Sequence, residues 1–199
     1  MNPLPVLFLK TVLFPAGRMS LHLTDPNLRQ LALDSIQTQH PVGICLSLQE
    51  SNLPDGEEAG LHLTGTEAQI ITHREVNTNT LSVELGGLRR FRIQHKILRT
   101  NNIAEASVCW LPEPQCSIPP ALADLLPLLI AMLSEAGITL PPPEQFTDAA
   151  WVGARYSEML PIPLRARQKL LELDDVIGRL EIIQQFLRQH NLLTQLPQG

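Results

Sequence analysis

Few of the side chains that usually bind nucleic acid occur in this chain of 199 residues. Its only lysines are Lys10, Lys96 and Lys169, and aromatic residues make up 4% of the sequence. The formal net charge is -5 and the sequence pI is about 5.6. Binding of nucleic-acid phosphates needs clustered basic side chains, and binding of single-stranded nucleic acid needs aromatic side chains on which the bases stack. The composition therefore argues against a nucleic-acid-binding protein.

Long hydrophobic runs are also missing, because no stretch approaches the roughly 20 apolar residues of a transmembrane helix. The start, MNPLPVLFLK, has no basic leader and is interrupted by prolines, so we expect no signal peptide. The three cysteines are Cys45, Cys109 and Cys116, an odd number without C-x-x-C spacing. This pattern argues against a disulfide framework and against structural zinc. We expect a cytoplasmic protein with no membrane segment.

Catalytic motifs are absent from the sequence. It has no G-x-x-x-x-G-K-[ST], G-x-S-x-G or H-E-x-x-H motif, and its six histidines do not recur at metal-ligand spacing. In His73-Arg74-Glu75, neighbours on a strand point to opposite faces, which works against a joint role. Lys169 lies in a charged amphipathic stretch where we expect it to face solvent rather than to activate a serine. We predict no enzyme, and no catalytic, cofactor-binding or metal-binding residues.

The first 116 residues carry the alternating pattern of strands. Period-two runs predict strands over 41–49, 62–76, 80–87, 89–98 and 102–111. Gly65 lies inside the second run, where a glycine indicates a bulge or a sharp bend. One helix is predicted from Pro26 to Gln37, with Thr24 or Asp25 as its N-cap. We therefore predict a β domain with one or two short helices.

From Ser117 onward the apolar residues recur at helical spacing. A first helix is predicted between Pro119-Pro120 and Gly137, and LPPPEQ (140–145) is predicted to be a stiff connector. Further helices are predicted from Thr147-Asp148 to Met159, from Leu164 to Leu173, and after Asp174-Asp175. We interpret the last two acids as a helix start rather than a metal site. The chain is thus predicted to be α+β, with a β domain over 1–116 and a bundle of about four helices over 117–199.

Two stretches combine basic and aromatic residues. In TVLFPAGR (11–18), the proline fixes φ and Gly17 can adopt positive φ, which predicts a sharp turn with Phe14 packed inward. We expect Arg18 to cap this turn or to pair with an acid such as Asp25. In RRFRI (89–93), alternation places both Arg90 and Arg92 on one face. We interpret that face as an outward polar surface over a buried aromatic, with a basic strip for an acidic partner as the alternative.

Several motifs, in order along the chain, resemble the substrate-binding domain at the N-terminus of Lon proteases. Thr11-Val-Leu-Phe-Pro-Ala-Gly-Arg18 is similar to the first motif of that family, and Leu63-Thr-Gly-Thr66, Arg90-Phe-Arg-Ile93 and Leu160-Pro-Ile-Pro163 follow in family order. The resemblance runs from about residue 4 to residue 192. It implies a PUA-like β pseudo-barrel followed by a helical bundle.

The same resemblance implies a function. Full Lon proteases continue into an ATPase module and a Ser-Lys peptidase module, which we do not find in these 199 residues. We expect a non-catalytic module that binds unfolded polypeptides or a partner protein through apolar patches and strand edges. Candidate surfaces are the strands beside the loop 50–60, the N-terminal strand, and a groove between the β domain and the helical tail.

Two alternatives remain. The PUA-like fold itself suggests an RNA-binding module, although the acidic composition weighs against it. A hydrolase assembled from distant residues is a third possibility with no supporting motif. The sequence leaves open the oligomeric state, the surface that binds the partner, and any cooperation with a separate ATP-dependent protease.

Overall fold

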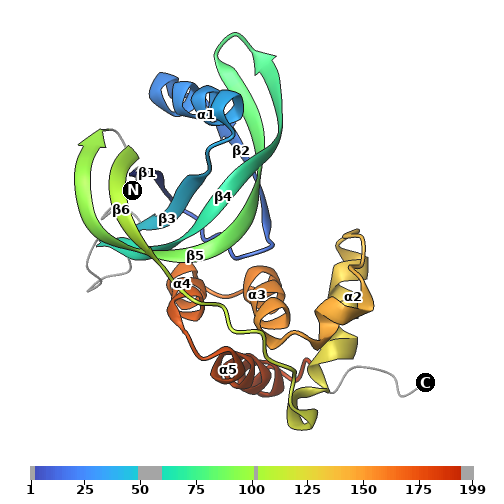
Figure 1. Cartoon of the computed structure of the whole chain (residues 1–199). Coiled ribbons are helices and arrows are strands. Elements are labelled where there is room, and N and C mark those ends of the chain that lie inside the picture. The colour runs from blue at the N-terminus through green and yellow to red at the C-terminus, as the bar shows by residue number, and fades with distance from the viewer. Residues whose placement is uncertain (1–2, 49–59, 101–102, 194–199) are drawn as a thin grey trace. The chain divides into compact units, whose positions relative to one another are not determined.

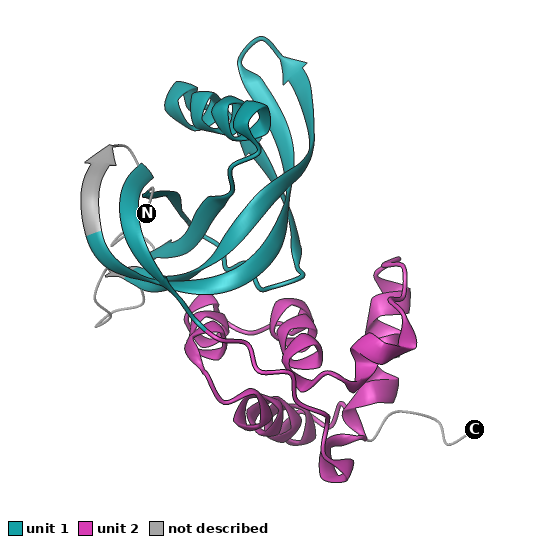
Figure 2. Cartoon of the chain, viewed as in Figure 1, with its two compact units in different colours: residues 1–111 teal, residues 112–199 magenta. Residues whose placement is uncertain are grey.

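The structure is a computed structural model that describes residues 3–48, 60–100 and 103–193 (Figure 1). It divides into two compact units, Met1–Leu111 and Pro112–Gly199 (Figure 2). Described residues of the first unit form six strands and one α-helix, and those of the second form four α-helices. The α+β prediction is confirmed. An independent domain boundary after residue 116 stays a prediction, and the predicted loop from residue 50 lies outside the described residues up to residue 59.

The first unit is a sheet that closes on itself. Its strands are β1 (Leu4–Leu9), β2 (Arg18–Leu23), β3 (Val42–Leu48), β4 (Gly60–Asn77), β5 (Thr80–Thr100) and β6 (Ile103–Trp110). They follow the order β2-β5-β4-β3-β1-β6, and β6 also pairs with β5. One edge of β5 therefore pairs with β2 in its first half and with β6 in its second half. This double pairing closes the pseudo-barrel that the family resemblance implied.

Strand β5 is a single strand where the sequence predicted two, over 80–87 and 89–98. The predicted interruption falls at the two consecutive glycines Gly86 and Gly87, which in the sequence indicate the end of a strand. A Cβ atom on Gly87 would lie 2.2 Å from the carbonyl oxygen of Phe14. The glycine is there because another backbone segment approaches the strand closely, and the strand itself continues.

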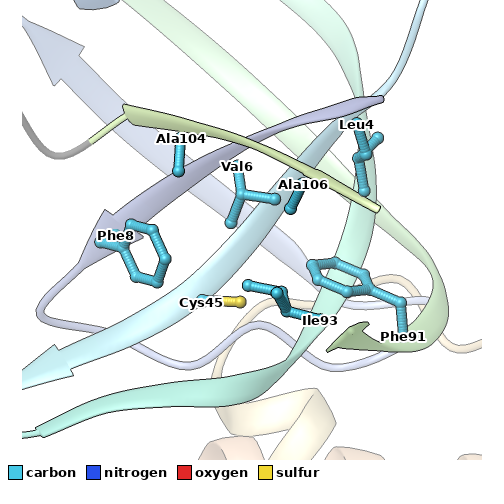
Figure 3. Packing of buried hydrophobic residues seen from close by; sticks show 8 residues of the cluster. All are labelled: Leu4, Val6, Phe8, Cys45, Phe91, Ile93, Ala104 and Ala106. Atoms are coloured by element: carbon cyan, nitrogen blue, oxygen red, sulfur yellow. The ribbon is translucent and has the colours of Figure 1, made fainter. Parts of the chain in front are cut away.

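The interior of the barrel is apolar on several strands at once. Side chains from β1, β3, β5 and β6 converge there, and Figure 3 shows Leu4, Val6, Phe8, Cys45, Phe91, Ile93, Ala104 and Ala106. Phe91 fits because Gly43 and Gly65 leave room for its ring, since a Cβ on either glycine would lie within 3 Å of Cζ. The ladder between β3 and β4 is irregular next to Gly65, as predicted.

Helix α1 (Pro26–Thr38) covers another part of the sheet. Asp25 is its N-cap and accepts hydrogen bonds from the backbone N–H groups of Asn27 and Leu28. Ala32 and Leu28 pack against apolar side chains of β2, β4 and β5. The predicted helix and one of its two predicted caps are confirmed.

The turn after β1 is formed differently from the prediction. Phe14 is fully buried, as expected, and the N–H of Gly17 donates to the carbonyl oxygen of Phe14 at 3.0 Å. The residue with positive φ is Ala16, at 58°, and not Gly17. A four-residue turn with positive φ at its third residue is type II, in which glycine usually takes that place. The prediction that Gly17 adopts positive φ was therefore wrong by one residue.

Contacts to the barrel hold this turn in place. The N–H of Ala16 donates to the carbonyl oxygen of Gly87 at 2.9 Å, and the hydroxyl of Thr66 donates to that of Leu13 at 2.6 Å. Arg18 pairs with Glu84 on β5, with 3.0 Å between Nη1 and Oε1. The expected acid, Asp25, instead caps α1, because its carboxylate faces the orphan N–H groups at the helix start.

The second unit contains α2 (Leu125–Glu135), α3 (Ala149–Met159), α4 (Leu164–Glu172) and α5 (Val176–Gln189). Asp148 and Asp175 are the N-caps of α3 and α5, which confirms both predicted starts. Two 3-10 helices, η2 (Pro120–Leu122) and η3 (Pro143–Thr147), complete it. The predicted connector 140–145 does not continue α2, and η3 begins within it, because proline is tolerated where the first N–H groups of a helix need no partner.

Candidate functional site

One end of the barrel is open and holds a cavity of about 610 Å³. We call this cavity the barrel mouth. It lies where β1 begins, where the chain enters β3, and where β6 runs past the start of β1. Its apolar lining consists of Pro3, Leu4, Pro5, Pro41, Val108 and Trp110. A concave apolar surface of this size is typical of a binding site.

The polar lining of the mouth comes from three strands and the turn before β3. It includes Gln94 and His95 on β5, Ser107 on β6 and His40. The one carboxylate in the described lining is that of Glu67 on β4, and its side chain is 7% exposed. A buried carboxylate without a counter-charge is energetically costly, so the charge of the mouth depends on the partner of Glu67.

Arg89 is that partner. Its Nε donates to Glu67 Oε2 at 2.7 Å, and its guanidinium carbon lies 3.5 Å from the centre of the Trp110 ring. The edge of that ring packs against Phe91 at 6.3 Å between centroids and 85° between planes. Salt bridge and cation–π contact together fix the indole at the mouth and leave the Glu67–Arg89 pair neutral.

The prediction for RRFRI needs a correction. Arg92 is exposed, but Arg90 is fully buried, so the two do not share an outward polar face or a basic strip. The exposed arginine with a defined role is Arg89, which the sequence analysis did not single out. Its partners, Glu67 and Trp110, come from two other strands. The contact between Arg89 and Trp110 depends on the strand register, which sets Phe91 opposite Trp110. A single sequence does not reveal that register.

Strand edges are distributed differently from the prediction. The N-terminal strand β1 is not an edge, because it pairs with β3 on one side and with β6 on the other. Strand β3, beside the loop 50–60, also has two neighbours, β1 and β4. Strands β4 and β6 each run beyond a neighbour: β3 pairs with β4 only as far as Ala68, and β1 with β6 only as far as Ala106. The groove between β domain and helical tail stays a prediction.

The other residues weighed in the sequence are not brought together. His73, Arg74 and Glu75 are exposed on β4, and Lys169 is exposed on α4. In the described ranges, no three or more His, Cys, Asp or Glu side chains are grouped so that they could hold a metal ion. None of the helices described combines the length and apolar content that a bilayer crossing requires.

Two ionisable groups of the helical unit have clearly perturbed pKa values. Burial raises the pKa of Tyr156, whose hydroxyl donates to the carbonyl oxygen of Leu125 at 2.5 Å. Burial also lowers the pKa of Arg155, an effect opposed by Glu158 at 2.9 Å. A buried tyrosine that donates to a backbone carbonyl packs two helices together, and no nucleophile is adjacent to it among these contacts.

The chain thus combines a closed barrel that carries an apolar cavity with a following unit of helices. The comparisons give the family. The family model for the ATP-dependent protease La (LON) substrate-binding domain matches residues 3–189. The chain therefore belongs to the Lon substrate-binding domain family, and the match covers no ATPase or protease domain.

Two solved structures are similar to the chain over nearly its whole length. The Lon N-terminal domain protein from Xanthomonas campestris is 30% identical, with a TM-score of 0.71, and the match covers 99% of this chain and 100% of that one. The N-terminal domain of Mycobacterium avium complex Lon protease has a TM-score of 0.65 at 20% identity, over 98% and 99% of the two chains. The latter likeness shows the fold alone. No curated protein matches the chain.

Proposed function

We propose that this protein is a non-catalytic module that binds unfolded polypeptides or a partner protein at the barrel mouth. The observation that carries the proposal is a 610 Å³ apolar cavity in a member of a substrate-binding domain family. Apolar side chains of an unfolded chain lose contact with water when they enter such a cavity, at about 25 cal/mol for each Å² buried. The mouth supplies this surface without requiring the partner to be folded.

The charge of the mouth favours polypeptide over RNA. A phosphate ligand needs basic side chains that are available to it, but Arg89 is already held by Glu67 at 2.7 Å and by the Trp110 ring. The remaining described lining is mostly proline, leucine, valine and tryptophan. RNA binding therefore remains the alternative for this fold and has no supporting contact at the mouth.

A cytoplasmic location is part of the proposal. The chain has three cysteines without a disulfide, and Cys109 is exposed, which suits a reducing compartment. Cell fractionation tests this part directly. Recovery of the protein in the membrane or extracellular fraction would contradict it.

The function is tested with purified protein on an immobilised array of unstructured peptides, at low and at high salt. We expect binding that survives high salt and increases with the apolar content of the peptide, because burial of apolar surface is not screened by ions. Absence of binding to every peptide at micromolar protein would contradict the proposal. Binding that is lost at high salt and prefers acidic peptides would contradict the apolar mechanism.

A matched pair of variants locates the binding. Trp110→Ala removes the indole that lines the mouth, and Trp151→Ala removes the other tryptophan, which packs on Phe146 in the helical unit. We expect Trp110→Ala to weaken peptide binding by about tenfold or more, as for aromatic anchors elsewhere, and Trp151→Ala to leave it unchanged. Circular dichroism of both variants shows that they are folded. Equal effects of the two changes would exclude the mouth as the site.

A further inference from the structure

We propose that Arg89 determines the specificity of the barrel mouth: with Arg89 in place, the mouth selects uncharged apolar side chains and rejects basic ones. Arg89 is not among the described residues that line the mouth, and it acts through two residues that do, Glu67 and Trp110. The inference rests on the proposed function and deepens it. It names the chemical class of polypeptide segment that the mouth accepts, an apolar segment without charged side chains.

An extra residue in β5 places Arg89 beside Glu67. The register of β4 against β5 shifts between Thr66 and Ala68. Leu88 and Arg89 of β5 both lie opposite Glu67 there, whereas a regular ladder sets one residue opposite one. Such a β-bulge changes the direction of a side chain at the point where it occurs. As a result, the Arg89 side chain, which is 54% exposed, meets the buried carboxylate of Glu67.

Glu67 is the group in the mouth that would attract a basic side chain. Its carboxylate is the one in the described lining. Arg89 Nε donates to Oε2 of Glu67 at 2.7 Å, and Nη2 lies 3.5 Å from Oε1, so the guanidinium faces both carboxylate oxygens. A lysine or arginine side chain of a ligand would meet a carboxylate that is already paired. It would lose its hydration without gaining a counter-charge, which makes its entry unfavourable.

Trp110 is the apolar surface that Arg89 holds in position. The guanidinium carbon lies 3.5 Å from the centre of the indole ring, and the ring also packs edge-to-face with Phe91. These two contacts restrict rotation of the indole, so an apolar side chain that enters the mouth meets a preformed surface. One guanidinium therefore neutralises the acid of the mouth and positions its largest apolar side chain.

The two members of the pair should affect specificity in opposite directions. Arg89→Met keeps a long side chain without its charge, which leaves the Glu67 carboxylate available to a cation. Glu67→Gln keeps the shape of the side chain without its charge, which leaves Arg89 available to a carboxylate. Specificity is a difference between affinities, so each change should shift the ligand preference toward the charge that has lost its partner.

The test uses the purified full chain and three fluorescein-labelled decapeptides in which leucine alternates with serine. The peptides differ at one central position, which carries leucine, lysine or glutamate. We expect the unchanged protein to bind the leucine peptide about tenfold more tightly than the other two in fluorescence anisotropy. In Arg89→Met the lysine peptide should gain about tenfold relative to the leucine peptide, and in Glu67→Gln the glutamate peptide should gain by a similar factor.

Two further variants separate the charge from the structure. Arg89→Lys keeps the positive charge and should keep the preference for leucine over lysine. The double variant Arg89→Met/Glu67→Gln removes both charges and should restore that preference. A purely structural role of Arg89 would not produce this pattern, because an unfolded fraction lowers the apparent affinity for all three peptides by the same factor.

Other outcomes overturn the inference. If the unchanged protein binds the leucine and lysine peptides equally, or if Arg89→Met leaves their ratio unchanged, Arg89 does not determine specificity, while the proposed polypeptide binding stands. A double variant that still favours lysine contradicts the role of the Glu67 charge. If circular dichroism shows that Arg89→Met is not folded, Glu67→Gln decides, and a variant without a shift toward glutamate overturns the inference. If the unchanged protein binds none of the peptides, the inference and the proposed function both fail.

Discussion

Each of the two units contains an arginine–glutamate pair, and the two pairs differ in exposure. The barrel unit places Glu67 and Arg89 at an open mouth, where they keep a tryptophan in position. The helical unit buries Arg179 completely, where its Nη1 and Nη2 donate to Glu113 and to the carbonyl oxygen of Leu173. Buried charges of the second kind add specificity to packing but leave no surface for a ligand. The pair at the cavity belongs to the surface where we propose binding, whereas the pair with Arg179 lies in the interior of the helical unit.

The two units also differ in the structural reason for their glycines. In the barrel, Gly65 lets two strands and an aromatic ring approach one another, because a Cβ there would lie 2.3 Å from the carbonyl oxygen of Ile44. In the helical unit, Gly137 has open space around it and is required instead by its φ of 67° after α2. Glycine is thus required by close packing in the barrel unit and by a positive φ in the helical unit.

The largest effect is expected from Arg179→Met. The change removes a fully buried guanidinium together with its contacts to Glu113 and to the Leu173 carbonyl oxygen, so the free energy of unfolding should fall by about 4 kcal/mol. The control is Arg188→Met, which breaks an exposed pair with Asp124 and should cost less than about 1 kcal/mol. Urea denaturation of both variants gives the two values. Equal costs would mean that the helical unit does not depend on its buried charge.

Gly65→Ala follows. Its Cβ would collide with the backbone of β3, so the free energy of unfolding should fall by about 3 kcal/mol. Gly137→Ala meets no atom within 4 Å and should lose only about 1 kcal/mol, through the strained φ. Thermal and urea denaturation compare the two. A cost for Gly137→Ala equal to that for Gly65→Ala would remove the distinction between a packing glycine and a backbone glycine.

Tyr156→Phe is expected to cost about 1 kcal/mol. It removes the buried hydroxyl that donates to the carbonyl oxygen of Leu125 and leaves the ring in place. Because the contact joins α3 to the start of α2, hydrogen exchange in α2 should become faster while exchange in β3 and β4 does not change. Faster exchange in the barrel strands would show that the two units unfold together.

The smallest effect has the opposite sign. Ala16 occupies a left-handed conformation in the type II turn, so Ala16→Gly should raise the free energy of unfolding by about 1 kcal/mol. Ala123 has φ of -67° and is exposed, so Ala123→Gly should lower it by roughly 0.5–1 kcal/mol. Calorimetry of both variants checks the signs. A destabilised Ala16→Gly variant would contradict the assignment of strain to this turn.

Local signals in the sequence were sufficient for the elements and their caps. Periodicity gave the helices and most strands, and Asp25, Asp148 and Asp175 each cap the helix that follows them. These features depend on residues within a few positions of one another, which a sequence displays directly.

Features that depend on strand pairing were not predictable in the same way. The burial of Arg90, the partnership of Arg89 with Glu67, and the pairing of β1 on both sides all follow from which strands are neighbours. Similarly, the double glycine in β5 was interpreted as a strand end because its close contact, the carbonyl oxygen of Phe14, lies far away in sequence. Strand register and topology depend on residues that are far apart in the sequence, and they determine which residues line the barrel mouth.

The most direct test of binding at the barrel mouth is hydrogen exchange at the amides of Val108 and Trp110, with and without an apolar peptide that the immobilised array selects. The account predicts that peptide slows exchange at both amides, since both residues line the cavity that the peptide fills, and leaves residues 71–76 on β4 unchanged. Unchanged exchange at Val108 and Trp110 under saturating peptide, or protection confined to β4, would contradict it.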